Sequence, residues 1–435
     1  MKRSEVRGDT MLSVSEAEAV IFNLVQPLNT QQDTQFVDLL AAGDGQSPAF
    51  GSRILASPVV SQLDFPHWDN SAMDGYAVRY EDVHECSEEK PAALEIVEEI
   101  PAGVQPKSTI QPGQAARIFT GALIPAGADT VVMQERTRRE ENRVIILDAP
   151  KPQEFVRQRG TYYQAGQQLL PAGILLKAPE IAVLAAAQCT QVRVFRRPRV
   201  ALLSTGDELV TPDKPLQPGQ IVDSNQYALS ALVRQIGAEP LMLGIVKDEP
   251  EALKQTIAHA IAHADVVLSS GGVSVGDYDY VEQILESLGG KIHIRAIATK
   301  PGKPLTVATF GNIFGNNARP VLYFGLPGNP VSALVSFWRF VQPAIKKLSG
   351  LAQGWEPAFV KALARQELRS GGKLETYIWG QLCLKDGMYE FQPAGGLQNS
   401  ANLINLAQTN GLAVLPAGKA LIAAGEQVQV LRVES

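Results

Sequence analysis

The feature that most constrains the fold is an alternation of apolar runs and helical segments between residues 198 and 349. The apolar runs VALLS, LMLGIV, DVVLSS, IHIRAI and VLYFG each have the length of a buried strand. Helical segments lie between or after them, near 225–236, 249–263, 280–288 and 330–348. This alternation is typical of a parallel sheet covered by helices on both faces. We therefore predict a doubly wound α/β domain over residues 198–349.

The rest of the chain predicts further domains. Its 435 residues, 45% of them apolar, are enough for two to four cores. Ser13 and Glu16 have capping-box spacing before an amphipathic helix, and residues 11–60 are predicted to pack with 155–197 as one domain. Short strands between Pro and Gly turns predict a β-rich domain at 61–154 and a C-terminal β-barrel or sandwich at 350–435.

Charge and composition argue against several function classes. The net charge of −6 gives no global positive field for nucleic acid or for an anionic membrane surface. The start MKRSEVRGDT lacks the apolar core of a signal peptide, and no run approaches the roughly 20 apolar residues of a membrane span. Three distant cysteines without CxxC spacing favour neither disulfides nor a thiolate metal site. We expect a cytoplasmic protein that binds anions locally.

Four loops are predicted where strands of the α/β domain end. They are STGDEL (204–209), SSGGVSVGDYD (269–279), KPGKP (300–304) and GLPGNPVSA (325–333). Ligands bind at this edge of an open parallel sheet, where helix N-termini favour anions. Gly271 and Gly272 permit close approach of the backbone to a ligand, and Ser274 supplies a hydroxyl donor. Four such loops at one edge predict a site for a phosphorylated ligand.

Most candidate residues in and near these loops also have a structural interpretation as cap, turn or surface positions. These residues are Glu208, Asp248, Asp279, Lys300, Lys303, Pro327 and Pro330. Asp248 and Asp279 each precede a glutamate by three residues, as helix N-caps do. Pro330 stands where a proline begins a helix, and lysines beside a Pro-Gly turn are commonly solvated. The residue types alone leave both interpretations open.

A second unusual segment, FPHWDNSAMDGYAV (65–78), lies in the predicted β-rich domain. It combines aromatic residues, proline, asparagine and two aspartates, which is more than a simple turn requires. Asp74 before Gly75 also suits a hairpin turn. Thr120 in FTGA and Arg157 in RQRG likewise suit turn and surface positions. Their interpretation therefore depends on the other motifs.

Together, six motifs in order strongly resemble the molybdopterin molybdenumtransferase family, which includes the bacterial insertase MoeA and the corresponding domain of gephyrin. The motifs are DNSAMDGYAV (69–78), RIFTGALIP (117–125) and the four loops of the α/β domain. The resemblance, over about residues 11–435, implies an α/β multidomain protein. Its expected parts are an elongated helical domain, a β-rich domain, a MogA-like molybdopterin-binding domain and a C-terminal β-barrel.

The resemblance also implies an activity and partners. Molybdate is inserted into adenylylated molybdopterin in the presence of a divalent cation, here Mg²⁺, and the products are molybdenum cofactor and AMP. Family members are homodimers whose active site lies between the α/β domain of one subunit and the β-rich domain of the other. Contacts with the molybdopterin adenylyltransferase and with apo-molybdoenzymes fit this role. Neither nucleic acid nor a membrane is expected as a partner.

Family functional positions map onto ten residues of this chain. They are Asp74, Thr120, Arg157, Glu208, Asp248, Asp279, Lys300, Pro327, Pro330 and Ser400. Asp248 and Asp279 are the predicted Mg²⁺ carboxylates, since Mg²⁺ bridges phosphate oxygens during cleavage of a phosphoanhydride.

The other roles follow the same chemistry. Glu208 is the predicted group that orients or deprotonates the attacking water or oxyanion, and Asp74 is the second catalytic candidate. The basic residues predicted to receive the anions are Arg157, Lys300 and Lys303. Backbone amides of the GGVS loop are predicted to hold the terminal phosphate.

Two positions depart from the family pattern. RGTYY places Thr161 and Tyr162 where acidic residues are expected, and Arg295 with Ala296 lies near the place of a family lysine. A pterin-binding carrier or scaffold of the same family with weakened catalysis is therefore the alternative hypothesis. The adenylyltransferase of the preceding step is a third. GGVSVG in place of a GGTG-type loop, and the length of 435 residues, argue against it.

Overall fold

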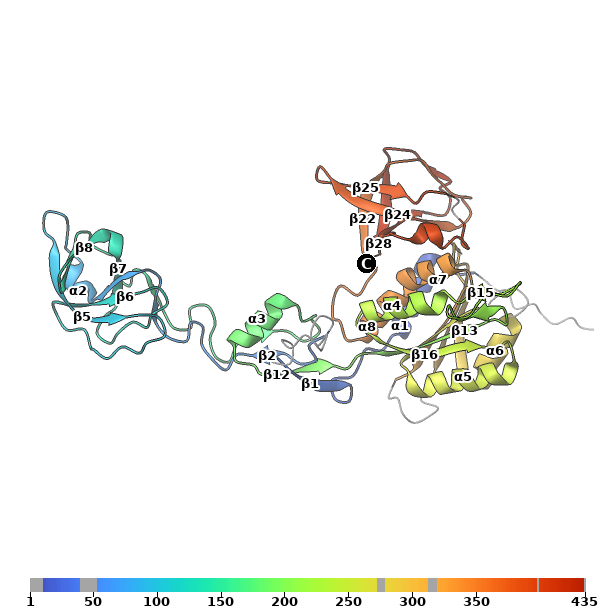
Figure 1. Ribbon diagram of the computed structural model, residues 1–435, viewed down its shortest axis with the longest axis horizontal. Helices are drawn as coiled ribbons and strands as arrows, with labels where there is room; N and C mark the ends of the chain where they lie inside the picture. The colour runs from blue at the N-terminus through green and yellow to red at the C-terminus, as the bar shows by residue number, and fades with distance from the viewer. Residues whose placement is uncertain (1–10, 40–52, 272–277, 312–318, 397–398, 434–435) are drawn as a thin grey trace, which may run out of the picture. The chain divides into compact units, whose positions relative to one another are not determined.

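The computed structural model describes residues 11–39, 53–271, 278–311, 319–396 and 399–433, which belong to two compact units (Figure 1). The main unit comprises Met1–Ser57, Ala172–Ala182 and Cys189–Ser435. The β-rich unit comprises Pro58–Pro171 and Val183–Gln188. Within the described ranges, no helix has the length and apolar character needed to cross a membrane.

The β-rich unit is built on a six-stranded sheet with the order β7-β4-β6-β5-β9-β8. Its strands are β4 (Gly75–Val78), β5 (Ala92–Ile100), β6 (Gln114–Ile118), β7 (Thr130–Met133), β8 (Thr137–Glu140) and β9 (Arg143–Ile146). Tyr76 and Val78 belong to one apolar cluster and Ala77 to another, because successive strand residues point to opposite faces. Both faces of this sheet are therefore covered.

Shorter elements complete this part of the chain. The pairs are β2 (Val59–Val60) with β11 (Gln168–Leu170), and β3 (Asn70–Ser71) with β10 (Val156–Arg157). The short helices are α2 (Tyr80–Val83), the 3₁₀ turn η2 (Gln134–Arg136) and α3 (Ala178–Ala186), the last of which spans the boundary between the two units.

Four of these strands, β5, β6, β7 and β9, confirm the predicted β-rich pattern. No strand was predicted at the positions of β4 and β8. β4 starts directly after Asp74 and pairs antiparallel with both β6 and β7, so it is an inner strand. β3, which precedes Asp74, pairs with β10 instead. The hairpin-turn interpretation of Asp74 is therefore wrong.

The main unit contains a second six-stranded sheet, with the order β16-β13-β17-β21-β20-β18. Its strands are β13 (Arg199–Thr205), β16 (Glu239–Val246), β17 (Val266–Ser270), β18 (Gly290–Ala296), β20 (Pro304–Phe310) and β21 (Val321–Leu326). β16, β13, β17 and β21 are parallel, as predicted. β20 was missed, and it runs antiparallel to both neighbours, so the sheet is mixed rather than wholly parallel.

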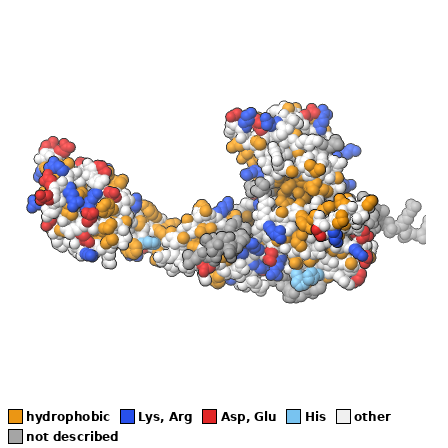
Figure 2. Space-filling view, viewed as in Figure 1, with side chains coloured by type: hydrophobic (Ala, Val, Ile, Leu, Met, Phe, Trp, Pro, Cys, Tyr) orange, Lys and Arg blue, Asp and Glu red, His pale blue; other side chains and the backbone are white. Residues whose placement is uncertain are grey.

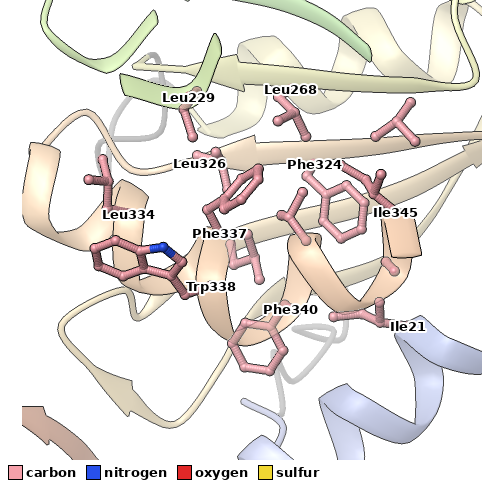
Figure 3. Packing of buried hydrophobic residues seen from close by; sticks show 14 of the residues in the cluster. Ile21, Leu229, Leu268, Phe324, Leu326, Leu334, Phe337, Trp338, Phe340 and Ile345 are labelled. Carbon is pink, nitrogen blue, oxygen red and sulfur yellow. The ribbon is translucent and has the colours of Figure 1, made fainter. Parts of the chain in front are cut away.

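Helices cover both faces of this sheet, which confirms the doubly wound arrangement. α5 (Pro250–His263) and α6 (Tyr278–Ser287) lie on one face. The other face is covered by α4 (Asn225–Gln235), α7 (Pro330–Ser336), the π-helix η3 (Phe337–Val341) and α8 (Gln342–Leu348). Figure 3 shows Phe337 of η3 beside Leu326 of the sheet, whereas Phe340 lies on the other side of η3, towards Ile21. Each such buried side chain contributes about 1.5–3 kcal/mol.

The N-terminal segment packs onto the same face. Ser13 caps α1 (Val14–Leu24): its side chain accepts from the Glu16 amide and the Glu16 carboxylate accepts from the Ser13 amide, which confirms the predicted capping box. Ile21 of α1 is fully buried in the cluster of Figure 3. Farther along, β1 (Thr34–Asp38) pairs antiparallel with β12 (Gln191–Phe195).

A closed β-barrel ends the main unit. Its five strands are β22 (Phe359–Ala364), β24 (Glu375–Lys385), β25 (Met388–Pro393), β26 (Gly411–Leu415) and β28 (Gln427–Arg432). They follow the order β24-β25-β22-β28-β26, and β26 pairs back to β24, which closes the ring. Minor elements are β23 (Leu368–Arg369), η4 (Ile404–Leu406) and β27 (Leu421–Ile422). Of the two predicted alternatives, the barrel is correct.

A buried ionic network joins the N-terminal segment to the α/β layer. Arg196 donates two hydrogen bonds of 2.7 Å to the carboxylate of Asp265, and Arg319 donates two of 2.8 and 2.9 Å to that of Asp33. Arg196 also contacts Asp33 at 2.9 Å. Burial alone would raise the pKa of Asp33, but the Arg319 hydrogen bond, an amide donor and both guanidinium charges lower it from 3.8 to about 2.

This network predicts an acid-sensitive contribution to stability. Because the pKa of Asp33 is lower in the folded chain than in the unfolded chain, its contribution is complete above about pH 4 and is lost as the pH falls towards 2. The urea midpoint of the native chain should therefore fall more steeply between pH 5 and pH 2 than that of an Asp33→Asn variant. Equal slopes in the two proteins would contradict this assignment.

Candidate functional site

Loops of the main unit meet at one edge of its sheet. Ser270 at the end of β17 pairs with Leu326 at the end of β21. Thr306, near the start of β20, pairs with Gly325, so β20 begins where β21 ends. β18 is antiparallel to β20 and therefore also ends there. The KPGKP turn thus lies at the edge predicted for the other loops, although one of its flanking strands runs in the opposite direction.

Three of these loops approach one another closely. Gly271 has φ +91°, and a Cβ atom there would lie 2.2 Å from the carbonyl oxygen of Thr205. A Cβ atom at Gly328 would lie 3.6 Å from the Cα of Gly271. The loops after β13, β17 and β21 are therefore in backbone contact, and only glycine fits at 271. The predicted residues Gly272 and Ser274 lie outside the described ranges.

Glu208 occupies the loop that follows β13, before the short pair β14 (Leu209–Val210) and β15 (Ile221–Val222). Its side chain is exposed and folds back over Gly206, where a Cβ atom would lie 2.6 Å from Glu208 Oε2. The neighbouring Asp207 accepts a 3.3 Å hydrogen bond from the Asp248 amide. The loop that carries Glu208 is therefore tied to the loop that carries Asp248.

Asp248 is exposed just before α5, whose N-cap is Glu249, so the N-cap interpretation of Asp248 is wrong. Burial raises the pKa of Tyr280 on α6, and the charges of Asp248 and Glu249 raise it further. Asp248 therefore lies near the first turn of α6. Asp279 is within that turn rather than at its cap position, and its side chain is outside the described structure.

The remaining candidates of the main unit lie on the other two loops. Lys300 and Lys303 are exposed on either side of the Pro-Gly turn. Pro327 is buried just after β21, and Pro330 opens α7, as expected for a helix start. Ser400 lies against the GLPGNP loop: its carbonyl accepts a hydrogen bond from the Val331 amide at 3.2 Å. Ser400 follows the barrel strand β25 in sequence but lies beside the GLPGNP loop in the structure.

Asn225 was missed by the sequence analysis. It is the first residue of α4 and only 6% exposed, and its side-chain amide donates a 2.8 Å hydrogen bond to the carbonyl of Gly328. Within the described structure its Oδ1 atom has no hydrogen-bond partner, and neither has Oγ1 of the buried Thr205. Buried polar atoms are normally paired, so both acceptors suit a ligand at this edge. An asparagine directly before a helical pattern was the signal available in the sequence.

In the β-rich unit, Asp74 and Thr120 come together. Asp74 Oδ1 accepts hydrogen bonds from the Thr120 amide at 2.8 Å and from its hydroxyl at 2.7 Å. The pKa of Asp74 is lowered by the amide bond first, then by the hydroxyl, with a smaller contribution from the charge of Arg117. Asp74 is therefore a carboxylate at neutral pH, joined to the FTGA loop.

Arg117 was also missed, although it begins the RIFTGA motif. Its guanidinium donates to the Gly75 carbonyl at 3.2 Å and to Gln134 Oε1 at 2.6 Å. It also stacks 5.0 Å from the ring centre of Tyr76. The charge is therefore fixed in place beside the Asp74 turn.

The third loop of the β-rich unit carries Arg157. Arg157 is half-buried on β10 and pairs with Asn70 on β3, so it is beside the DNSAMDG segment. Arg159 is held by a 2.7 Å ion pair with Asp64. Tyr162, in place of an acidic residue, is 67% exposed. The predicted residues of this unit thus lie on three neighbouring loops.

The predicted residues therefore form two groups. Those at the loop edge of the main unit are Glu208, Asp248, Gly271, Lys300, Lys303, Pro327, Pro330 and Ser400. Those of the β-rich unit are Asp74, Thr120 and Arg157. Among the described residues on the face in Figure 2, Lys and Arg are interspersed with Asp and Glu, as expected for local rather than global anion binding.

Three family descriptions match the chain in order. The MoeA N-terminal region (domain I and II) matches residues 12–187, a probable molybdopterin binding domain matches 201–347, and the MoeA C-terminal region (domain IV) matches 361–433.

Individual proteins agree with these matches. The molybdopterin molybdenumtransferase of Nostoc sp. PCC 7120 is 66% identical over 97% of this chain and 94% of its own. That of Haemophilus influenzae is 34% identical over 97% and 98%. The crystal structure of the molybdopterin biosynthesis MoeA protein of Pyrococcus horikoshii has a TM-score of 0.79 and 27% identity, covering 98% of this chain and 100% of that one.

Proposed function

The chain belongs to the MoeA family, and from this premise we propose that it is a molybdopterin molybdenumtransferase of molybdenum cofactor biosynthesis. The observation that carries the proposal is the convergence of the TGDEL, KPGKP and LPGNP loops with Gly271 at one sheet edge, within the part that matches a molybdopterin binding domain. Backbone amides, two lysines and exposed carboxylates at such an edge suit a phosphorylated pterin.

The proposed substrates are adenylylated molybdopterin and molybdate. The phosphoanhydride bond between the pterin phosphate and AMP is cleaved, AMP leaves, and molybdenum remains on the pterin. Glu208 is proposed to orient or deprotonate the attacking water or oxyanion, since its carboxylate is exposed in the loop tied to Asp248. Lys300 and Lys303 are proposed to receive the oxyanions, because both side chains are exposed at the same edge.

Mg²⁺ is proposed as the cofactor, with Asp248 and Asp279 as its protein ligands. Among the described residues, no three His, Cys, Asp or Glu side chains form a metal cluster. Mg²⁺ commonly takes only one or two protein carboxylates together with substrate phosphates and water. The exposed Asp248 beside the first turn of α6 has this character. Bound there, Mg²⁺ would neutralise charge on the phosphates.

We further propose a homodimer in which Asp74, Thr120 and Arg157 of one copy complete the site at the loop edge of the other. The candidate residues belong to two compact units, and each unit carries one part of the proposed site. Contacts with the adenylyltransferase that supplies the substrate, and with the enzymes that receive the cofactor, belong to the same proposal.

A mixing experiment tests the shared site. Asp74→Asn and Glu208→Ala homodimers should each be nearly inactive. After exchange of subunits in equal amounts, half of the dimers are mixed, and each mixed dimer has one intact site. Activity should therefore rise to about a quarter of the wild-type value. Continued inactivity, although mixed dimers are demonstrated, would place Asp74 and Glu208 in the same subunit's site and contradict the arrangement.

The transferase activity itself is tested with adenylylated molybdopterin, molybdate and Mg²⁺, by measuring AMP. The alternative, a carrier or scaffold with weakened catalysis, is motivated by the exposed Tyr162. It predicts tight pterin binding without AMP, and AMP formation only after Tyr162→Asp. The transferase proposal predicts AMP from the native chain.

A further inference from the structure

The segment that leads into the KPGKP turn is held by backbone hydrogen bonds on two sides. On one side, Ala298 donates to the Leu12 carbonyl at 2.7 Å and the Leu12 amide donates to Ala296 at 3.3 Å. On the other side, the Glu375 amide donates to the Ala298 carbonyl at 3.1 Å. From there β19 (Thr299–Lys300) pairs in parallel with the start of β24. The N-terminal segment and the barrel therefore both hydrogen-bond to the backbone of residues 296–300.

One buried side chain joins these two contacts. Arg339 of η3 is 5% exposed, and its Nη2 donates to Glu18 Oε2 of α1 at 2.6 Å. Its Nε donates to the hydroxyl of Tyr377 at 2.9 Å, and that hydroxyl donates to Glu375 Oε1 at 2.5 Å. Glu18 lies six residues after Leu12 along the chain, and Tyr377 lies two residues after Glu375. A single guanidinium therefore connects α1 with β24.

Arg339 is buried, so its charge depends on these hydrogen-bond partners. A buried charge is costly unless it is paired, and removal of one partner leaves the others unsatisfied. The ion pair with Glu18 and the bonds to Tyr377 hold the guanidinium in its charged form, and its pKa is raised although burial opposes this. It also lies 5.2 Å from the ring centre of Phe340. The five residues of η3 form a π-helix, a distortion that is frequent at functional sites.

The turn itself rests on the same helical layer. Gly302 has φ +98°, and a Cβ atom there would lie 2.7 Å from the hydroxyl of Ser336, the last residue of α7 before η3. The turn is thus seated on the helix that continues into the Arg339 segment. Lys300 and Lys303 flank Gly302 and remain exposed. The lysine backbone is fixed while the ammonium groups stay free to meet a ligand.

We propose that Arg339 and Tyr377 are positioning residues for the KPGKP turn, and that the barrel serves the active site by holding Lys300 and Lys303 at the loop edge. This inference rests on the proposed function, in which the two lysines receive the oxyanions of molybdate and of the pterin phosphate. Neither Arg339 nor Tyr377 touches a substrate. They act through the backbone of residues 296–303.

Tyr377→Phe tests the inference, because it removes only the hydroxyl between Arg339 and Glu375. KM for molybdate should rise about tenfold, which corresponds to one lost hydrogen bond to a charged group, while kcat stays within about twofold. The matched control is Tyr389→Phe, which removes a phenolic hydroxyl from β25, near the opposite end of the barrel hairpin. It should change neither constant. An unchanged KM in Tyr377→Phe would overturn the proposal.

Hydrogen exchange separates this inference from the proposed function. In Tyr377→Phe, amides of residues 298–303 should exchange at least about tenfold faster, whereas amides of the central strand β17 should be unchanged. Hydrogen exchange needs no turnover, so it tests the positioning role of Arg339 and Tyr377 even if the native chain releases no AMP. Glu18→Gln is a second variant, which removes the charge of the carboxylate that pairs with Arg339, and it should give the same pattern of faster exchange. Uniformly faster exchange throughout the main unit, or no change in the turn, would overturn the inference.

Discussion

Replacement of Glu208 by glutamine is expected to lower kcat for AMP release by about 10²- to 10⁴-fold, which is the usual contribution of a general acid or base. Glutamine keeps the size and the hydrogen-bonding shape of the side chain but cannot take a proton. Binding of adenylylated molybdopterin should change by less than about threefold, because the side chain is exposed and the loop is held by the bond from the Asp248 amide to Asp207 and by that from the Leu209 amide to the Gly206 carbonyl.

The control for this substitution is Glu239→Gln in the same sheet. Glu239 opens β16, at the opposite end of the strand from the loop edge, and is also exposed. It should retain native kcat and KM. If Glu208→Gln kept more than about a tenth of the native kcat, Glu208 would not be the general base, and the exposed Asp207 beside it would become the next candidate.

Gly271→Ala is expected to lower the free energy of unfolding of the main unit by about 3–5 kcal/mol and to abolish pterin binding. Two effects add here. The φ of +91° disfavours any side chain, and the new Cβ atom would lie 2.2 Å from the Thr205 carbonyl oxygen, which belongs to a buried strand and cannot move away. The loop must therefore separate from β13.

Gly219→Ala is the control, because it carries only the first effect. Gly219 has a similar φ of +88°, but a Cβ atom at this position would meet nothing within 4 Å, so its substitution should cost only about 1 kcal/mol. Urea unfolding and pterin binding measured on both variants give the comparison. Equal losses in the two variants would show that close contact at Gly271 does not shape the site.

The sequence predicted the sheet of the main unit best, because the parallel strands β13, β17 and β21 are buried on both faces and leave uninterrupted apolar runs. It missed β20, where PLTVATF follows the KPGKP turn and alternates apolar residues with threonines. It missed β4 because GYAV is short and follows residues typical of a turn. Local pattern identifies a strand only when the run is long enough, whereas its neighbours in the sheet are decided by tertiary contacts.

The candidate site was predictable where the backbone itself carries the signal. Gly271 was singled out for close approach of the backbone to a ligand. The structure shows its backbone close to Thr205, and the approach to a ligand stays a prediction. Asn225 and Arg339 were not singled out from the sequence. Their hydrogen-bond partners, Gly328, Glu18 and Tyr377, are more than 30 residues away along the chain. No local spacing encodes such contacts. The N-cap interpretation of Asp248 failed because α5 begins one residue later, with Glu249 as its cap.

The most direct measurement is the amount of AMP released per molybdenum retained when the native chain is incubated with adenylylated molybdopterin, molybdate and Mg²⁺. A molybdenumtransferase with the proposed site should release about one AMP for each molybdenum transferred, and Glu208→Ala should release about 10²-fold less or lower still. Binding of the pterin without AMP release above that of Glu208→Ala would contradict the transferase and leave a carrier.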